Sequence, residues 1–167
     1  MPDGATPVGT TTLVLGVGNP LMSDDGVGQR LLAALESIEP RLEGVDYVDA
    51  GTLSLLLLPR IEDCGSLLVL DAARLGRRAA EVRVLSGADM DSFLMSAACS
   101  VHEVGLRDLL DAARLTGALP SRRAFVGIEP ARVGWGASLS PEVAVAVEPA
   151  SRFARALIED WRRESAG

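Results

Sequence analysis

Acidic residues and one imidazole are the groups in this sequence that could act on a substrate together. Asp24 and Asp25 follow the glycine-containing stretch GVGNPLMS, and Asp71 follows the apolar run SLLVL. Asp49 lies near the end of a third segment, VDYVDA, and His102 is the only histidine of the chain. Carboxylate oxygens and a neutral imidazole are suitable ligands for a first-row divalent metal ion, and a carboxylate near such an ion can activate water. The residue types therefore favour a metal-assisted site.

Strands are needed to bring these residues together, and the sequence predicts five of them. Short apolar runs rich in strand-forming residues occupy 13–17, 45–50 and 66–70, and each leads to one of the acidic residues. Further strands are predicted at 81–85, where alternation suggests an edge position, and at 124–128. Because the carboxyl ends of parallel strands meet at one edge of a sheet, Asp24, Asp25, Asp49 and Asp71 should converge there.

Helices are predicted between and after the strands from capping signals and apolar stripes. The predicted helices are 24–38 capped by Ser23, 53–61 capped by Thr52, 101–115 after the capping box at 100–103, and a last helical region from 141 onward after Ser140. Pro59 should disturb the last turn of the second helix, and Pro149 should kink or split the final one. The stretch 87–99 shows no clear pattern. Alternating strands and helices predict an α/β fold, a three-layer sandwich with a mostly parallel five-stranded twisted sheet between helices.

The position of His102 bears on its protonation. It lies two residues after a predicted helix cap, where the helix dipole disfavours imidazolium, so we expect it to be neutral near pH 7 and able to bind a metal ion. A less specific interpretation is also open. A single histidine in a first helical turn is commonly a surface residue, and Asp24 and Asp25 could serve only to stabilise a helix start, by about 0.3–1 kcal/mol each.

Composition limits the class of protein. With 167 residues and 48% hydrophobic content, the chain is expected to form a single α/β domain, 1–167, in which 1–10 are a flexible leader. The net charge of −7 and the lack of a long basic run argue against a nucleic-acid partner. No apolar run approaches about 18 residues, so no membrane insertion is expected. Cys64 and Cys99 stand singly, which is typical of the reducing cytoplasm.

Two other chemistries are open from these patterns. The GVG turn after a strand resembles the start of a dinucleotide-binding fingerprint, but Leu21 stands where the third glycine belongs and the acidic pair would repel a pyrophosphate. A nucleotide-binding α/β enzyme is therefore the less favoured alternative. Cys99 and His102 are close enough in sequence to suggest a nucleophile and its base, although an inert buried cysteine explains Cys99 as well.

The loop at 129–139, EPARVGWGASL, is expected to be mobile and exposed because Gly134 and Gly136 flank Trp135. Trp135 could grip a partner protein, or it could fold back onto the last helix. Further on, Phe153, Leu157 and Trp161 recur at helical spacing and are expected to pack into the core.

Several of these motifs together resemble the hydrogenase maturation protease family. They are GVGNPLMSDDGVG after the first strand, VDAGT at 48–52, LVLDA at 68–72, SVHEVGLRDLL at 100–110, and a Gly-Trp-Gly loop leading to LSPEV. The resemblance runs from about Leu13 to Pro149. It implies a twisted sheet between helices and an endopeptidase of the aspartyl type, which removes the C-terminal extension from the large-subunit precursor of a nickel-iron hydrogenase after nickel insertion.

The resemblance also assigns roles to individual residues. It implies that Asp25, Asp71 and His102 contact the metal, that Asp25 and Asp71 are catalytic, and that nickel is a recognition element supplied by the substrate. Many relatives carry glutamate at the position of Asp25, which here is one methylene shorter; we favour Asp25 as the group that activates water. Supporting or substrate-binding roles fall on Gly18, Asn19, Asp24, Asp49, Gly51, Thr52 and Trp135. A non-catalytic nickel-sensing chaperone of the same precursor is the alternative.

Overall fold

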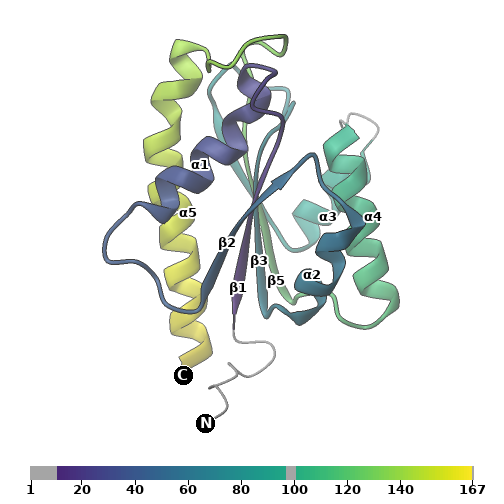
Figure 1. Ribbon diagram of the computed structural model, residues 1–167. Coiled ribbons are helices and arrows are strands. Elements are labelled where there is room, and N and C mark those ends of the chain that lie inside the picture. Colours follow the sequence, from purple (N-terminus) through teal and green to yellow (C-terminus); the bar gives the residue numbers. More distant parts are fainter. Residues whose placement is uncertain (1–10, 97–100, 167) are drawn as a thin grey trace.

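A five-stranded sheet runs through the middle of the computed structural model, which describes residues 11–96 and 101–166 (Figure 1). The strands are β1 (Thr12–Val17), β2 (Val45–Gly51), β3 (Ser66–Ala72), β4 (Val82–Ser86) and β5 (Arg122–Ile128). Their order across the sheet is β2-β1-β3-β5-β4, and only β4 is antiparallel to its neighbour. The predicted α/β class, the mostly parallel sheet and the edge position of the fourth strand are confirmed.

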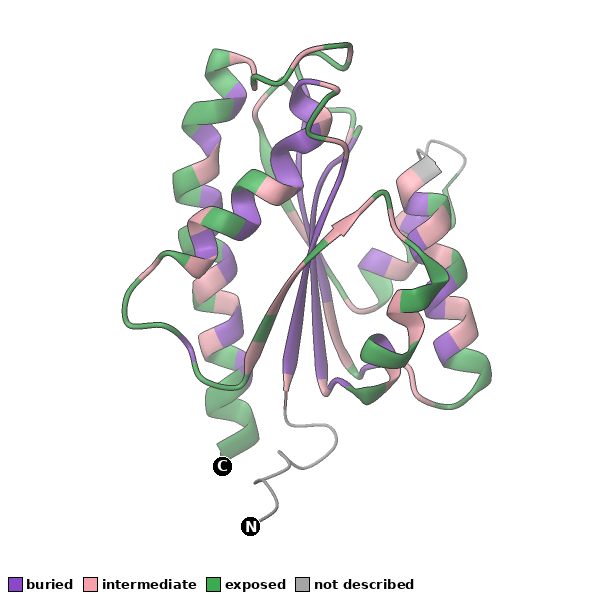
Figure 2. Cartoon of the chain, viewed as in Figure 1, coloured by how far each residue is buried: buried purple, intermediate pink, exposed green. Residues whose placement is uncertain are grey.

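Helices cover both faces of this sheet. One face carries α1 (Val27–Glu36) and α5 (Pro141–Ala166), and the other carries α2 (Leu58–Asp63), α3 (Ala88–Leu94) and α4 (Val101–Leu115). Successive residues of a strand point to opposite faces, so Val14 and Leu68 enter the core under α1 and α5 while Leu13 and Leu67 enter the core under α4. Because both of its faces are covered, β3 is buried along its whole length (Figure 2). The three-layer arrangement is as predicted.

The start of the first helix differs from the prediction. Asp24 and Asp25 form a short 3-10 turn, Asp24–Gly26, and α1 begins only at Val27. Ser23 does not cap it: the Ser23 hydroxyl donates instead to the carbonyl of Gly134, at 2.9 Å. The helix then lies directly on the sheet, since a Cβ atom at Gly28 would be 2.0 Å from the Val17 carbonyl oxygen.

The segment after β2 also differs. Its first helical turn is a 3-10 helix at Leu55–Leu57, and the Ser54 hydroxyl, rather than Thr52, caps it by accepting a hydrogen bond from the Leu56 amide at 3.2 Å. Pro59 lies in the first turn of α2, where a missing amide proton costs nothing, and not in the last turn. The predicted helix over 53–61 is therefore two short pieces that begin later.

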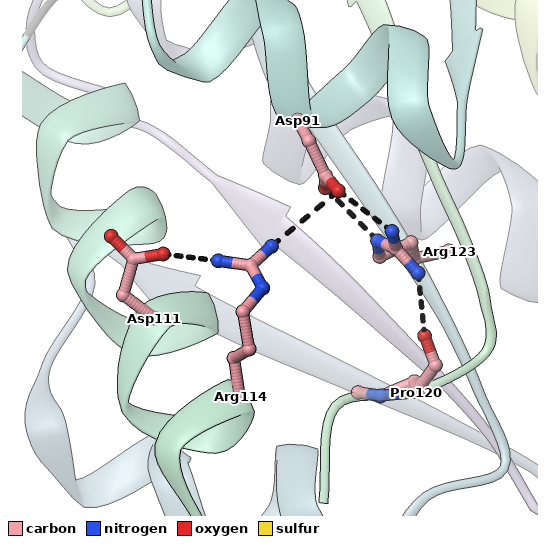
Figure 3. A network of polar contacts seen from close by, with 5 residues as sticks. All are labelled: Asp91, Asp111, Arg114, Pro120 and Arg123. Carbon is pink, nitrogen blue, oxygen red and sulfur yellow. Dashed lines mark hydrogen bonds and ion pairs between the residues drawn. The ribbon is translucent and has the colours of Figure 1, made fainter. Parts of the chain in front are cut away.

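The unpatterned stretch after residue 87 contains the short helix α3, which the sequence did not reveal. Two buried residues, Met90 and Leu94, are too few to show a helical period. A polar contact holds the helix as well: Asp91 accepts from the Arg123 guanidinium at 2.7 and 3.0 Å, and from Arg114 at 3.4 Å (Figure 3). This network ties α3 to both α4 and β5.

The last helix is continuous. It extends from Pro141 to Ala166 with Pro149 in its interior, so the predicted split is wrong. Phe153 was expected in the core, yet 55% of its surface is exposed, whereas Trp161 is buried. The inward face is instead lined largely by small residues, at Ala146, Ala150 and Ala154. Among the helices of residues 11–96 and 101–166, none has the length and apolar character needed to cross a membrane.

Candidate metal and catalytic site

Three of the predicted site residues meet at the carboxyl edge of the sheet. The imidazole of His102 lies between two carboxylates: its Nε2 is 3.8 Å from Asp25 Oδ2, and its Nδ1 is 3.8 Å from Asp71 Oδ2. The three come from the turn after β1, the end of β3 and the first turn of α4. The meeting of Asp25 and Asp71 was expected from the parallel topology, and the place of His102 beside them was implied by the family resemblance.

A tight turn after β1 positions Asp25. Its Oδ2 accepts a hydrogen bond from the Asn19 amide at 3.0 Å, and the Gly18 amide donates to the Gly51 carbonyl at 2.8 Å. A Cβ atom at Gly18 would lie 1.9 Å from the Asp25 carbonyl oxygen, so the turn closes only with glycine. Because Asp25 already occupies the Asn19 amide, this turn is a poor cradle for a phosphate, which disfavours the dinucleotide interpretation.

Asp71 is a buried carboxyl group near the carboxyl end of β3. Its side chain is 2% exposed, and its Oδ1 has no hydrogen-bond partner among the described residues. Burial is the main reason that the pKa of Asp71 rises from 3.8 to about 7, and His102 opposes that rise. Asp71 therefore changes its protonation near neutral pH.

His102 is more basic than the sequence suggested. The Asp71 carboxylate is the largest influence and raises the pKa of His102, burial opposes this, and Asp25 and Glu103 raise it further. The pKa of His102 is therefore raised above its ordinary value, in the direction opposite to the one expected from a helix start alone. The expectation considered only groups close in sequence.

The donor types suit a first-row divalent ion, and the uncommitted Oδ1 of Asp71 leaves a further oxygen available. Within the two described ranges, however, no group of three or more His, Cys, Asp and Glu side chains is arranged so that it could hold a metal ion by itself. Asp25, Asp71 and His102 thus present an incomplete set of oxygen and nitrogen ligands. Cys64 adds no thiolate near neutral pH, because burial raises its pKa to about 11.

Asp24 does not join this site, contrary to the prediction. It is fully buried and accepts hydrogen bonds from the Ala131, Arg132 and Ser140 amides at 2.6–2.9 Å and from the Ser140 hydroxyl at 2.8 Å. Burial by itself would raise the pKa of Asp24, but these hydrogen bonds hold it below its ordinary value. Asp24 is an anchor that joins the turn after β1 to the start of α5.

Asp49 also stays outside the cluster. It is exposed and its Oδ1 accepts from the Gly51 amide at 2.9 Å and from Gln29 Nε2 at 3.4 Å. Gln29 in turn donates to the Gly18 carbonyl at 2.7 Å. Gln29, which the sequence analysis missed, links the first two loops; its place four residues after Asp25, on the same side of the helical start, was the available signal.

The loop around Trp135 is attached rather than free. The Ser23 amide donates to the Gly136 carbonyl at 2.7 Å, and the Gly136 amide donates to the Leu21 carbonyl at 3.0 Å. The Trp135 side chain is nevertheless 84% exposed, so the alternative in which it folds onto the last helix is wrong. Its contact with a partner stays a prediction.

Replacing Asp24 by asparagine tests the anchor. Asp24→Asn keeps the shape but loses the charged acceptor, so the free energy of unfolding should fall by about 2–3 kcal/mol at pH 7. The folded pKa of Asp24 is depressed, so its stabilisation is present above pH 3.8 and lost as pH falls through the folded value. Urea unfolding at neutral and strongly acidic pH measures both effects.

The matched control for this test is Asp46→Asn, an exposed position on β2. It should change the free energy of unfolding by less than about 0.5 kcal/mol. Equal effects of the two substitutions at neutral pH would contradict the anchoring role.

Comparisons with known proteins show which family this chain resembles in sequence. The model of the family described as hydrogenase maturation protease matches residues 30–156, a range that includes Asp71 and His102. The chain is similar to the hydrogenase expression/formation protein HupD of Rhodobacter capsulatus, with 32% identity over 150 residues that cover 89% of this chain and 71% of that protein. It is 33% identical to the hydrogenase 2 maturation protease of Escherichia coli, over 83% of this chain and 84% of that one.

A solved structure shares the fold as well. The hydrogenase maturating endopeptidase HybD from Escherichia coli superposes with a TM-score of 0.83 at 30% identity, covering 90% of this chain and 93% of that one. A hydrogenase maturation protease HybD from Thermococcus kodakarensis gives a TM-score of 0.74 at 27% identity, covering 88% of this chain and 98% of the other.

Proposed function

The chain belongs to the hydrogenase maturation protease family, whose members are peptidases, and we propose that it removes the C-terminal extension of a nickel-iron hydrogenase large-subunit precursor after nickel insertion. The observation that carries this proposal is the imidazole of His102 between the Asp25 and Asp71 carboxylates. The reaction would take place in the cytoplasm, in keeping with Cys64 as a free thiol.

Nickel enters this proposal as part of the substrate. Asp25, Asp71 and His102 offer oxygen and nitrogen but no sulfur, so a nickel ion already held by cysteine thiolates of the precursor would gain ligands here. The enzyme would thereby recognise a loaded precursor and leave an empty one uncut.

The two carboxylates suit different tasks in hydrolysis. Asp25 has a side chain that is 20% exposed, against 2% for Asp71, so a water molecule can reach Asp25. We assign Asp25 as the base: it takes a proton from water, the water oxygen attacks the peptide carbonyl, and the proton passes to the leaving amine as the C–N bond breaks. Bound nickel supplies polarisation of that carbonyl. Asp71, whose Oδ2 lies 3.8 Å from His102 Nδ1, would keep His102 in place and supply negative charge to a bound ion.

Substitution of the two inner residues tests the proposal. Asp71→Asn and His102→Ala should each lower processing of a nickel-loaded precursor at least about a hundredfold, as judged by the mass of the product. Asp71→Asn should also raise the free energy of unfolding at pH 8 by about 2–4 kcal/mol, because it removes a carboxylate whose burial is unfavourable. The unfavourable free energy of burying the Asp71 carboxylate is absent below the pKa that Asp71 has in the unfolded chain, and it reaches its full size above about pH 7.

Asp46→Asn, at an exposed position, is the control and should process at the parental rate. Parental activity in Asp71→Asn or His102→Ala would show that the site is elsewhere. Tight binding of the precursor without any cleavage by the parental protein would instead favour the chaperone alternative.

The pH dependence of processing should follow the buried pair. Protons on Asp71 and His102 compete with nickel, so the rate of processing should fall as pH drops below about 7. With an ordinary histidine pKa of about 6.5, the fall would come at lower pH. Initial rates measured between about pH 5.5 and 8.5 with the same loaded precursor give the profile. A flat profile across that range would contradict the assignment of these two residues.

A further inference from the structure

We propose that a groove between the loop after β2 and helix α4 binds an aliphatic side chain of the precursor and so helps to select the segment that is cut; this rests on the proposed function. The groove has a volume of about 280 Å³. Residues 52–55 form one wall, and Gly105, Asp108 and Leu109 form the other. Its size suits one or two side chains rather than a separate small ligand.

The groove lies one helical turn from His102 along α4. Gly105 lies three residues after His102 and on the same side of α4, about 4.5 Å further along the helix axis. The opposite wall begins at Thr52, directly after β2 ends. An extended peptide advances about 3.3 Å per residue, so a chain held at His102 would reach the groove within one or two residues.

Gly105 keeps this space open. A Cβ atom there would lie 3.9 Å from the Cβ and Cδ1 atoms of Leu53, which is ordinary contact, so the helix packing does not require glycine. Glycine in a helix interior lowers helix stability relative to alanine. Because Gly105 has no side chain, there is room between α4 and Leu53.

The opposite wall carries two leucines, Leu53 and Leu55, beside the hydroxyl side chains of Thr52 and Ser54. Leu53 has φ of +70°, a conformation unfavourable for residues other than glycine, and such strain is concentrated at functional sites. Leu55 and its neighbour Leu56 are 71% and 87% exposed. Strained and exposed leucines beside a site indicate a surface that a partner covers.

The lining determines the kind of occupant. Leu53, Leu55 and Leu109 supply the aliphatic part of the lining and Thr52 and Ser54 add two hydroxyl groups, while Asp108 is its one charged residue within the described part of the chain. An acidic side chain would meet that carboxylate, and a strongly polar one would lose its water among leucines. The geometry therefore fits an uncharged aliphatic side chain on an extended segment of the precursor, with Asp108 facing a backbone amide or a basic neighbour.

Filling the groove is the first test. Gly105→Leu adds a side chain without opening a cavity, so the protein should melt at or above the parental temperature while KM for the loaded precursor rises at least about tenfold with little change in kcat. The control is Ala166→Leu, which adds a similar group to a hollow at the amino-terminal ends of β1 and β3. The control should process at the parental rate.

A charge in the exposed wall is the second test. Leu55→Asp should raise KM at least about fivefold, whereas Leu115→Asp, at an 89% exposed leucine at the far end of α4, should not. Both substitutions add the same charge at exposed positions, so folding and general charge effects are matched.

Affinity for the precursor, measured by fluorescence anisotropy with labelled precursor, separates the groove from the proposed function. Loss of affinity in Gly105→Leu and Leu55→Asp, with both controls unchanged, supports the groove whether or not the parental protein cuts. Parental affinity and KM in both variants would overturn it. Absence of cleavage by the parental protein would overturn the proposed function alone.

Discussion

The buried carboxyl group of Asp71 is the constraint on which the site depends. It is carried by β3, which is paired on both sides by β1 and β5 and covered on both faces, so the carboxyl group cannot move out to solvent. Burial without a full set of hydrogen bonds disfavours the charged form and raises its pKa to about 7. A positive charge beside Asp71 would lower the free energy of burying its carboxylate, and His102 is the neighbouring group of the protein that lowers the pKa of Asp71.

Other residues at the carboxyl edge of the sheet hold Asp25 in position beside His102. The two adjacent aspartates after β1 have opposite uses: Asp24 is buried and satisfied by four hydrogen bonds, while Asp25 turns towards His102. Through these hydrogen bonds, Asp24 joins the loop that contains Trp135 and the start of α5 to the turn that carries Asp25. The groove at Gly105 lies beside the same site, so a bound segment would be held next to Asp25 by ordered elements.

The sequence predicted the five strands, the α/β class and the meeting of Asp25 and Asp71, because apolar runs and parallel topology decide these, and the family resemblance added His102 to them. It did not predict features that depend on contacts between residues far apart along the chain. The groups that bind Asp24 lie 107 to 116 positions away, and Ser23 finds its partner 111 positions away. The direction of the pKa shift of His102 was missed for the same reason, since the sequence gives the local helix start but not the contact with Asp71. Helix α3 was missed because two buried residues show no period.

The central claim is that the protein provides an incomplete nickel site that a loaded precursor completes. Calorimetric titration of nickel into the isolated protein tests this most directly. We expect affinity weaker than micromolar, with little change in His102→Ala, because oxygen and nitrogen ligands alone are offered to the free ion. Affinity tighter than micromolar that His102→Ala abolishes would show a self-sufficient metal centre and contradict the account.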